Sequence, residues 1–188
     1  MRDTTEGGEF LLRALDGRLP GARDHADATA SYAFASAAQL GLERDVCLAV
    51  REAARLHEVG KLYVPAMLLA RPASELSPQQ LERVESHAPA GARLARGAGM
   101  PEQACEWILH SGQRFDSGVE LPLPSRIIAA ACAYDSLLRE QAGTGGAAHR
   151  WALIGVIEGA GGRLDPMVVD GLARVVERAA GAVGPPAG

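Results

Sequence analysis

The sequence of 188 residues is poor in lysine, cysteine and aromatic residues. Lys61 is its only lysine, and arginine supplies the other eighteen basic side chains. Because the chain uses arginine everywhere else, we expect the one retained lysine to have a specific task. Three cysteines, Cys47, Cys105 and Cys132, are an odd number without C-x-x-C spacing. This number and spacing do not indicate a disulfide framework, and they predict reduced thiols.

Long apolar runs and an excess of positive charge are also absent. No run approaches the roughly 20 residues that span a bilayer, and residues 1–6 do not begin a signal peptide. We therefore expect a cytoplasmic protein with no membrane partner. The formal net charge is -4 and the arginines are scattered, which gives no electrostatic reason to expect nucleic acid as a partner.

The composition favours helices that pack through small and aliphatic side chains. Alanine, leucine, valine and arginine dominate, while aromatic residues make up 4%. We expect an all-α bundle that forms one domain over residues 1–182, with a flexible tail at 183–188. Apolar spacing and glycine or proline stops predict a short helix from Phe10 to Gly17 and further helices over 24–40, 43–57, 77–94, 101–112, 127–138, 151–158 and 166–179. A glycine-rich stretch at 143–146 predicts a mobile link.

The sequence from Leu56 to Lys61 combines three side chains that can do chemistry. His57 and Glu58 place an imidazole beside a carboxylate, and Lys61 follows His57 by four residues. On a helix this spacing puts His57 and Lys61 on one face.

Several motifs in a fixed order resemble the HD-GYP family and cover residues 10–178. They are LGLE at 40–43, ARLHEVGKLYVP at 54–65, LSP at 76–78, SHAPAG at 86–91, RFDSG at 114–118, LPLPSRII at 121–128, AYDSL at 133–137 and GGRLDP at 161–166. The family consists of all-helical, metal-dependent phosphohydrolase domains that open cyclic di-GMP with a cluster of two or three metal ions. The resemblance therefore implies an HD-domain bundle of about 7–9 helices.

The resemblance assigns site residues by position. His25 matches the family's first histidine ligand, and His87 matches a later one. His57 matches the histidine of the HD pair, while Glu58 stands where the family has the aspartate that bridges two metals. Lys61 matches the lysine near the scissile phosphate, so a residual catalytic role falls to it.

Other positions depart from the family. Its paired histidines align with Ser111 and Gly112, neither of which replaces imidazole as a ligand. His110 lies one residue earlier, and a shift of one residue turns a helical side chain by about 100°. The aspartate that closes the metal site aligns with Cys132, which is either a soft ligand that favours zinc or a small buried hydrophobic residue. Asp135 remains as the second acid of that helix and is expected to cap or pair inside the bundle.

The Gly-Tyr-Pro signature is missing as well, and its loop is shortened to residues 118–120. The metal set His25, His57, Glu58, His87 and Cys132 is then a vestigial or partial site for no metal or for one divalent ion, zinc, manganese or iron.

Three functions are compatible with these changes. The first is a degenerate domain with impaired or lost cyclic di-GMP phosphodiesterase activity that serves as a regulatory or protein-interaction module, with a protein partner or as a homodimer. The second is a phosphohydrolase with a mononuclear site that acts on cyclic di-GMP or another phosphoester. The third, a sensor that binds cyclic di-GMP without turnover, is disfavoured by the lost Gly-Tyr-Pro loop.

Overall fold

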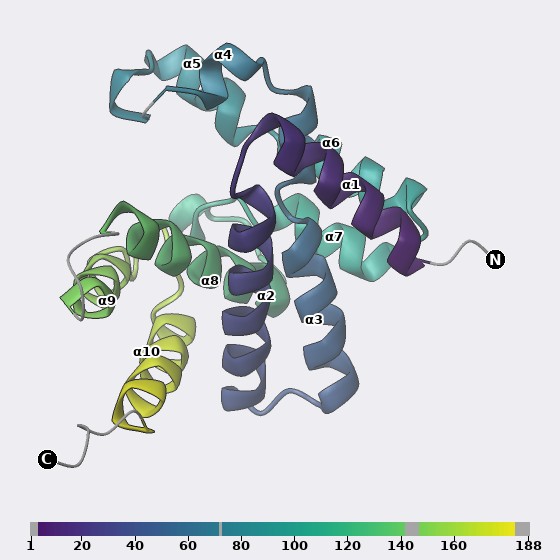
Figure 1. Cartoon of the computed structure of the whole chain (residues 1–188). Coiled ribbons are helices and arrows are strands. Elements are labelled where there is room, and N and C mark those ends of the chain that lie inside the picture. The colour runs from purple at the N-terminus through teal and green to yellow at the C-terminus, as the bar shows by residue number, and fades with distance from the viewer. Residues whose placement is uncertain (1–3, 72, 142–146, 183–188) are drawn as a thin grey trace, which may run out of the picture.

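A computed structural model describes residues 4–71, 73–141 and 147–182, and this part of the chain is helical (Figure 1). Nine helices of eight residues or more and the single-turn α4 make up these described ranges, and the only β pairing in them is an isolated bridge between Ala160 and Leu164. The helices are α1 (Thr4–Arg18), α2 (Ala22–Gln39), α3 (Arg44–Leu56), α4 (Ala66–Leu69), α5 (Pro78–Glu85), α6 (Ala88–Gly97), α7 (Glu102–His110), α8 (Leu123–Glu140), α9 (Ala148–Glu158) and α10 (Pro166–Ala182). Three 3-10 helices, η1 (Val59–Tyr63), η2 (Ala73–Glu75) and η3 (Phe115–Ser117), complete the chain order. The predicted all-α bundle is confirmed.

Two sequence predictions lie outside the described residues, namely the link at 143–146 and the tail at 183–188. Within the described ranges, no helix combines the length and apolar character needed to cross a membrane.

The centre of the bundle is built from α2, α3 and α8. α2 has its most extensive contacts with the other two, and α2 and α3 lie side by side in the middle of Figure 1. Four buried alanines, Ala26, Ala30, Ala33 and Ala37, follow one face of α2 at helical spacing. Their small side chains allow close packing of the three helices that carry most of the site. Gly41, with φ of 80°, makes the tight turn from α2 to α3.

The predicted helix over 77–94 is wrong, because it is two helices that meet at His87. Its start is as expected, since Ser77 and Gln80 form a capping box at the N-terminus of α5. Pro89 interrupts the helix because it lacks an N–H and its ring would collide with the carbonyl group four residues earlier. α5 therefore ends at Glu85, and α6 restarts after His87.

A close backbone approach joins η1 to α6. A Cβ atom added to Gly60 would lie 2.0 Å from the carbonyl oxygen of His87 and 2.6 Å from the amide nitrogen of Gly91. Only glycine fits this contact. The contact brings the segment with Glu58 and Lys61 beside His87.

Candidate metal centre

Four side chains with metal-ligating atoms meet between α2, the end of α3 and α8. His25, His57, Glu58 and Cys132 each offer one donor atom, and these atoms lie within 4.8 Å of one another. Among the described residues, no other group of three or more such side chains is this compact. Two imidazoles, a carboxylate and a thiol suit a first-row transition metal or zinc.

His57 provides the clearest sign of a ligand. The residue is 4% exposed, and its Nδ1 lies 2.7 Å from the carbonyl oxygen of Ala54. Because a carbonyl only accepts, Nδ1 carries the proton and donates this hydrogen bond. Burial lowers the pKa of His57, which keeps the ring neutral. Its Nε2 is buried without a hydrogen-bond partner, so a lone pair is available that a metal ion would satisfy.

His25 is held in position by an acid. Its Nδ1 lies 2.6 Å from Oδ2 of Asp135, which also accepts a hydrogen bond from Arg139. Its Nε2 lies 3.8 Å from Oε2 of Glu58 and 3.6 Å from Sγ of Cys132. Histidine ligands generally donate their second N–H to a carboxylate or carbonyl group, which fixes the ring. Asp135 performs this task for His25.

The electrostatics of His25 follow from the same contacts. Burial lowers its pKa, but the hydrogen bonds to Asp135 and Cys132 and the charge of Glu58 raise it more strongly, to about 9. A metal ion at Nε2 would therefore have to displace a proton.

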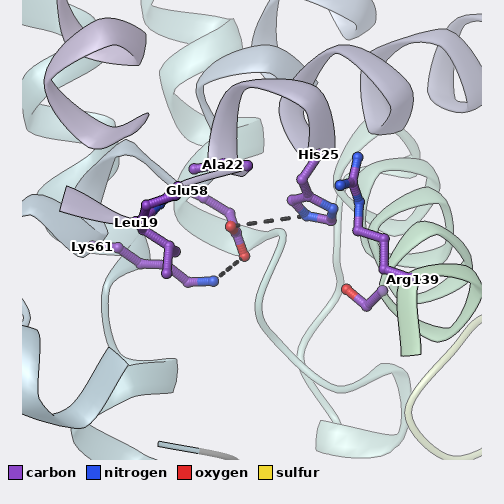
Figure 2. Close-up of a pocket in the computed structure, with 9 residues that line it drawn as sticks. Leu19, Ala22, His25, Glu58, Lys61 and Arg139 are labelled. Atoms are coloured by element: carbon purple, nitrogen blue, oxygen red, sulfur yellow. Dashed lines mark hydrogen bonds and ion pairs between the residues drawn. The ribbon is translucent and has the colours of Figure 1, made fainter. Parts of the chain in front are cut away.

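Glu58 lies between Lys61 and His25, as Figure 2 shows. Burial would raise its pKa, but the positive charges of Lys61 and His25 and the hydrogen bond from Lys61 hold it well below the usual range. Glu58 is thus an ionised carboxylate. Lys61 is bound to its Oε1 through a short ion pair.

Two pockets open onto this group. The larger has a volume of about 510 Å³ and is lined by His57, Glu58, Lys61 and Cys132 on one side. The smaller, of about 250 Å³, reaches His25 beside the Glu58–Lys61 pair (Figure 2). Three of the four ligand residues, His57, Glu58 and Cys132, therefore belong to the wall of the larger pocket.

His87 lies in the wall of the larger pocket but outside the four-residue group. Its Nδ1 donates a hydrogen bond to the carbonyl oxygen of Val84 at 2.9 Å. Burial lowers its pKa. The ligands predicted from the sequence are thus divided into a compact group of four and one separate imidazole.

Elsewhere in that wall, the described residues form no second compact group of donors. Ser111 and Gly112, which align with the paired histidines of the HD-GYP family, line the pocket. The hydroxyl of Ser111, which follows the last residue of α7, donates to the carbonyl oxygen of Ile108 at 2.9 Å. His110 is not part of the pocket wall, and its Nδ1 pairs with Gln113 at 3.2 Å.

The sequence predicts that Asp135 caps or pairs inside the bundle, and the structure identifies His25 as its partner. The two residues are 110 positions apart, and no local pattern joins them. The spacing in α8 could have indicated that Asp135 lies near the site. Asp135 follows Cys132 by three residues and precedes Arg139 by four, so the three side chains are neighbours on the helix.

The fold and the site together define an all-helical domain in which a His–Glu pair forms part of a compact group of metal-ligating side chains. The chain belongs to the HD-domain family, whose family model matches residues 9–168.

Curated relatives agree with this assignment. The chain is 27% identical over 135 residues to a probable cyclic di-GMP phosphodiesterase of Vibrio cholerae. This alignment covers 63% of this chain and 30% of the relative. It is also 27% identical over 174 residues to the cyclic di-GMP phosphodiesterase response regulator RpfG of Xanthomonas campestris, in an alignment that covers 87% of this chain and 46% of the relative. The cyclic di-GMP phosphodiesterase of Thermotoga maritima is 26% identical over 151 residues, in an alignment that covers 71% of this chain and 41% of the relative. The chain therefore spans less than half of each of these relatives.

Solved structures share the fold. The HD domain of the phosphodiesterase PgpH from L. monocytogenes, solved in complex with cyclic di-AMP, superposes with a TM-score of 0.66 at 19% identity, covering 95% of this chain and 99% of that one. The protein Bd1817 of Bdellovibrio bacteriovorus has a TM-score of 0.65 at 15% identity, covering 83% and 52%.

Proposed function

We propose that this HD domain holds one divalent metal ion, has impaired or lost cyclic di-GMP phosphodiesterase activity, and serves as a regulatory or protein-interaction module in bacterial signalling. The relatives are named as cyclic di-GMP phosphodiesterases.

One observation carries the proposal. The described residues contain a single compact group of donors, and the pocket wall has Ser111 and Gly112 at the positions where the family resemblance predicts imidazoles. Hydrolysis of a phosphodiester by this chemistry uses two metal ions about 3.5–4 Å apart, which activate water and hold the leaving oxygen. Glu85, His87 and Glu140 also line the pocket, but among the described residues they form no second compact group of donors.

The test is cyclic di-GMP hydrolysis by the purified chain, loaded in turn with zinc, manganese or iron. The Thermotoga maritima relative serves as the positive control. We expect turnover lower than that of the control by more than about 100-fold, because a lost ligand set costs more than the 10- to 100-fold typical of residues behind the ligands. Turnover within tenfold of the control would overturn the proposal.

A rescue variant makes the test specific. Ser111→His with Gly112→His restores imidazoles in the pocket wall, and a matched control places one histidine at Gln113, also in that wall. We expect a second metal ion and increased hydrolysis in the double variant alone. Equal gains in the control would refute the role given to the missing imidazoles.

A phosphohydrolase with a mononuclear site is the second candidate. The observation in its favour is that Lys61 lies beside the donor group and lines a pocket of about 510 Å³, large enough for a small ligand. It predicts metal-dependent cleavage of some phosphoester that disappears together with the metal in His57→Ala.

We place the surface for the proposed protein partner on α9, which lies at the edge of the bundle in Figure 1. Trp151, Ile154 and Ile157 are exposed there, three residues apart. This spacing places them within about 120° of one another around the helix. Sedimentation analysis of the wild type and Trp151→Ser tests the homodimer form of the proposal, which requires a dimer that the variant weakens.

A further inference from the structure

Cys132 differs from the other two cysteines in its surroundings. Cys47 and Cys105 are buried, and their Sγ atoms face backbone carbonyl oxygens of Leu42 at 3.4 Å and Met100 at 3.6 Å. Cys132 is partly exposed and lines the larger pocket. Its Sγ faces a side chain, Nε2 of His25, at 3.6 Å.

The distance between these two atoms fits zinc coordination. Zinc binds histidine nitrogen at about 2.0–2.1 Å and cysteine sulfur at about 2.3 Å, and a tetrahedral angle between them places nitrogen and sulfur about 3.6 Å apart. A hydrogen bond between thiol and imidazole has a similar length, so this distance alone does not decide.

His57 decides between the two interpretations. Its Nε2 belongs to the same donor group, is buried, and has no hydrogen-bond partner. A buried acceptor without a partner is costly. A thiol–imidazole hydrogen bond at His25 leaves that cost in place, whereas an ion shared by all four donors removes it.

Building on the proposed single-metal site, we propose that Cys132 is a thiolate ligand that selects zinc, and that His25, His57, Glu58 and Cys132 together close the coordination sphere of the ion. On binding, the S–H bond of Cys132 and the Nε2–H bond of His25 break, bonds from sulfur and from that nitrogen to zinc form, and both protons leave to solvent. Sulfur is a soft donor and favours zinc over manganese.

The number of protein ligands has a functional consequence. Structural zinc sites have four protein ligands, while catalytic ones have three and keep a position for water. A closed sphere leaves no position for the water that hydrolysis needs. The ion then stabilises the junction of α2, α3 and α8 and keeps the domain folded as a binding module.

Cobalt(II) is the probe that tests this assignment, because a thiolate bound to cobalt gives a near-ultraviolet charge-transfer band and a tetrahedral site gives intense visible bands. We expect both features in the full chain. Cys132→Ala should bind cobalt more weakly and lose the charge-transfer band, while Cys105→Ala, the matched control, should keep it. Cobalt bound with an unchanged spectrum in Cys132→Ala overturns the assignment.

Thiol alkylation gives a second readout. With no metal added, iodoacetamide should modify one cysteine, Cys132, and zinc should protect it. In Cys132→Asp, the ratio of zinc to manganese affinity should fall by more than about tenfold, since a replaced ligand outweighs changes behind the ligands. Alkylation at an equal rate with and without zinc overturns the proposal.

Failure of this inference can be told apart from failure of the proposed function. One metal ion per chain without a sulfur band overturns the role of Cys132 alone. Robust cyclic di-GMP hydrolysis or two metal ions per chain overturns the proposed function, whatever the spectrum shows.

Discussion

The substitution Gly60→Ala tests how tightly the fold couples η1 to α6. The added Cβ would lie 2.0 Å from the carbonyl oxygen of His87, whereas real Cβ atoms stay beyond 3.0 Å. The two backbones would have to separate by about 1 Å. Overpacking of this kind costs about 1–3 kcal/mol, and both contacts are with backbone, which places the cost near the upper end.

Alanine also returns some stability, because it has less freedom than glycine in the unfolded chain. This gain is at most about 1 kcal/mol. The net loss of unfolding free energy is then about 2 kcal/mol. For a domain of this size, each kcal/mol shifts Tm by about 2–4 °C, so Tm should fall by about 4–8 °C.

Thermal unfolding followed by circular dichroism measures this shift. Gly97→Ala is the matched control, because Gly97 also belongs to α6 and nothing lies within 4 Å of its added Cβ. The control should be neutral or stabilised by up to about 1 kcal/mol. A Tm of Gly60→Ala within about 2 °C of the wild type would refute the reasoning.

Two further predictions concern the side chains around the site and at the surface. Asp135→Ala removes the acceptor that orients His25, so metal affinity should fall about 10- to 100-fold in a competition assay with a chromophoric chelator; unchanged affinity would contradict that role. Glu9 has a lowered pKa because of its hydrogen bonds to Arg55 and Arg23, so its stabilisation is present above the unfolded pKa of about 4.3 and is lost as the pH falls through the lower folded value. Glu9→Gln should therefore reduce the free energy of unfolding by up to about 1 kcal/mol at pH 7 and by less in acid; urea unfolding at both pH values checks this, and an equal loss at both would be inconsistent with it.

Local patterns in the sequence were sufficient to predict most helices. The apolar spacing of 43–57 and the stop at Gly41 correspond to α3 and the turn before it. The break at His87 was missed because apolar and polar residues continue with helical spacing across it. Pro89 breaks the helix despite that spacing, because it has no N–H to donate and its ring collides with the carbonyl group four residues earlier.

The candidate site was predictable only in part. The motif with His57 and Glu58 is local, and the family resemblance added His25 and Cys132, which the structure brings together. The place of His87 beside the segment with Glu58 and Lys61 depends on how η1 and α6 approach at Gly60, and the support of His25 by Asp135 depends on the packing of α2 against α8. Local sequence patterns do not predict such contacts between distant segments.

The central claim is that the chain keeps one metal site and lacks the second. Elemental analysis of protein purified without chelator, before and after loading with zinc, manganese or iron, tests it most directly. The account predicts one ion per chain, lost in His57→Ala. Two ions per chain, or a folded protein that takes up none, would contradict it.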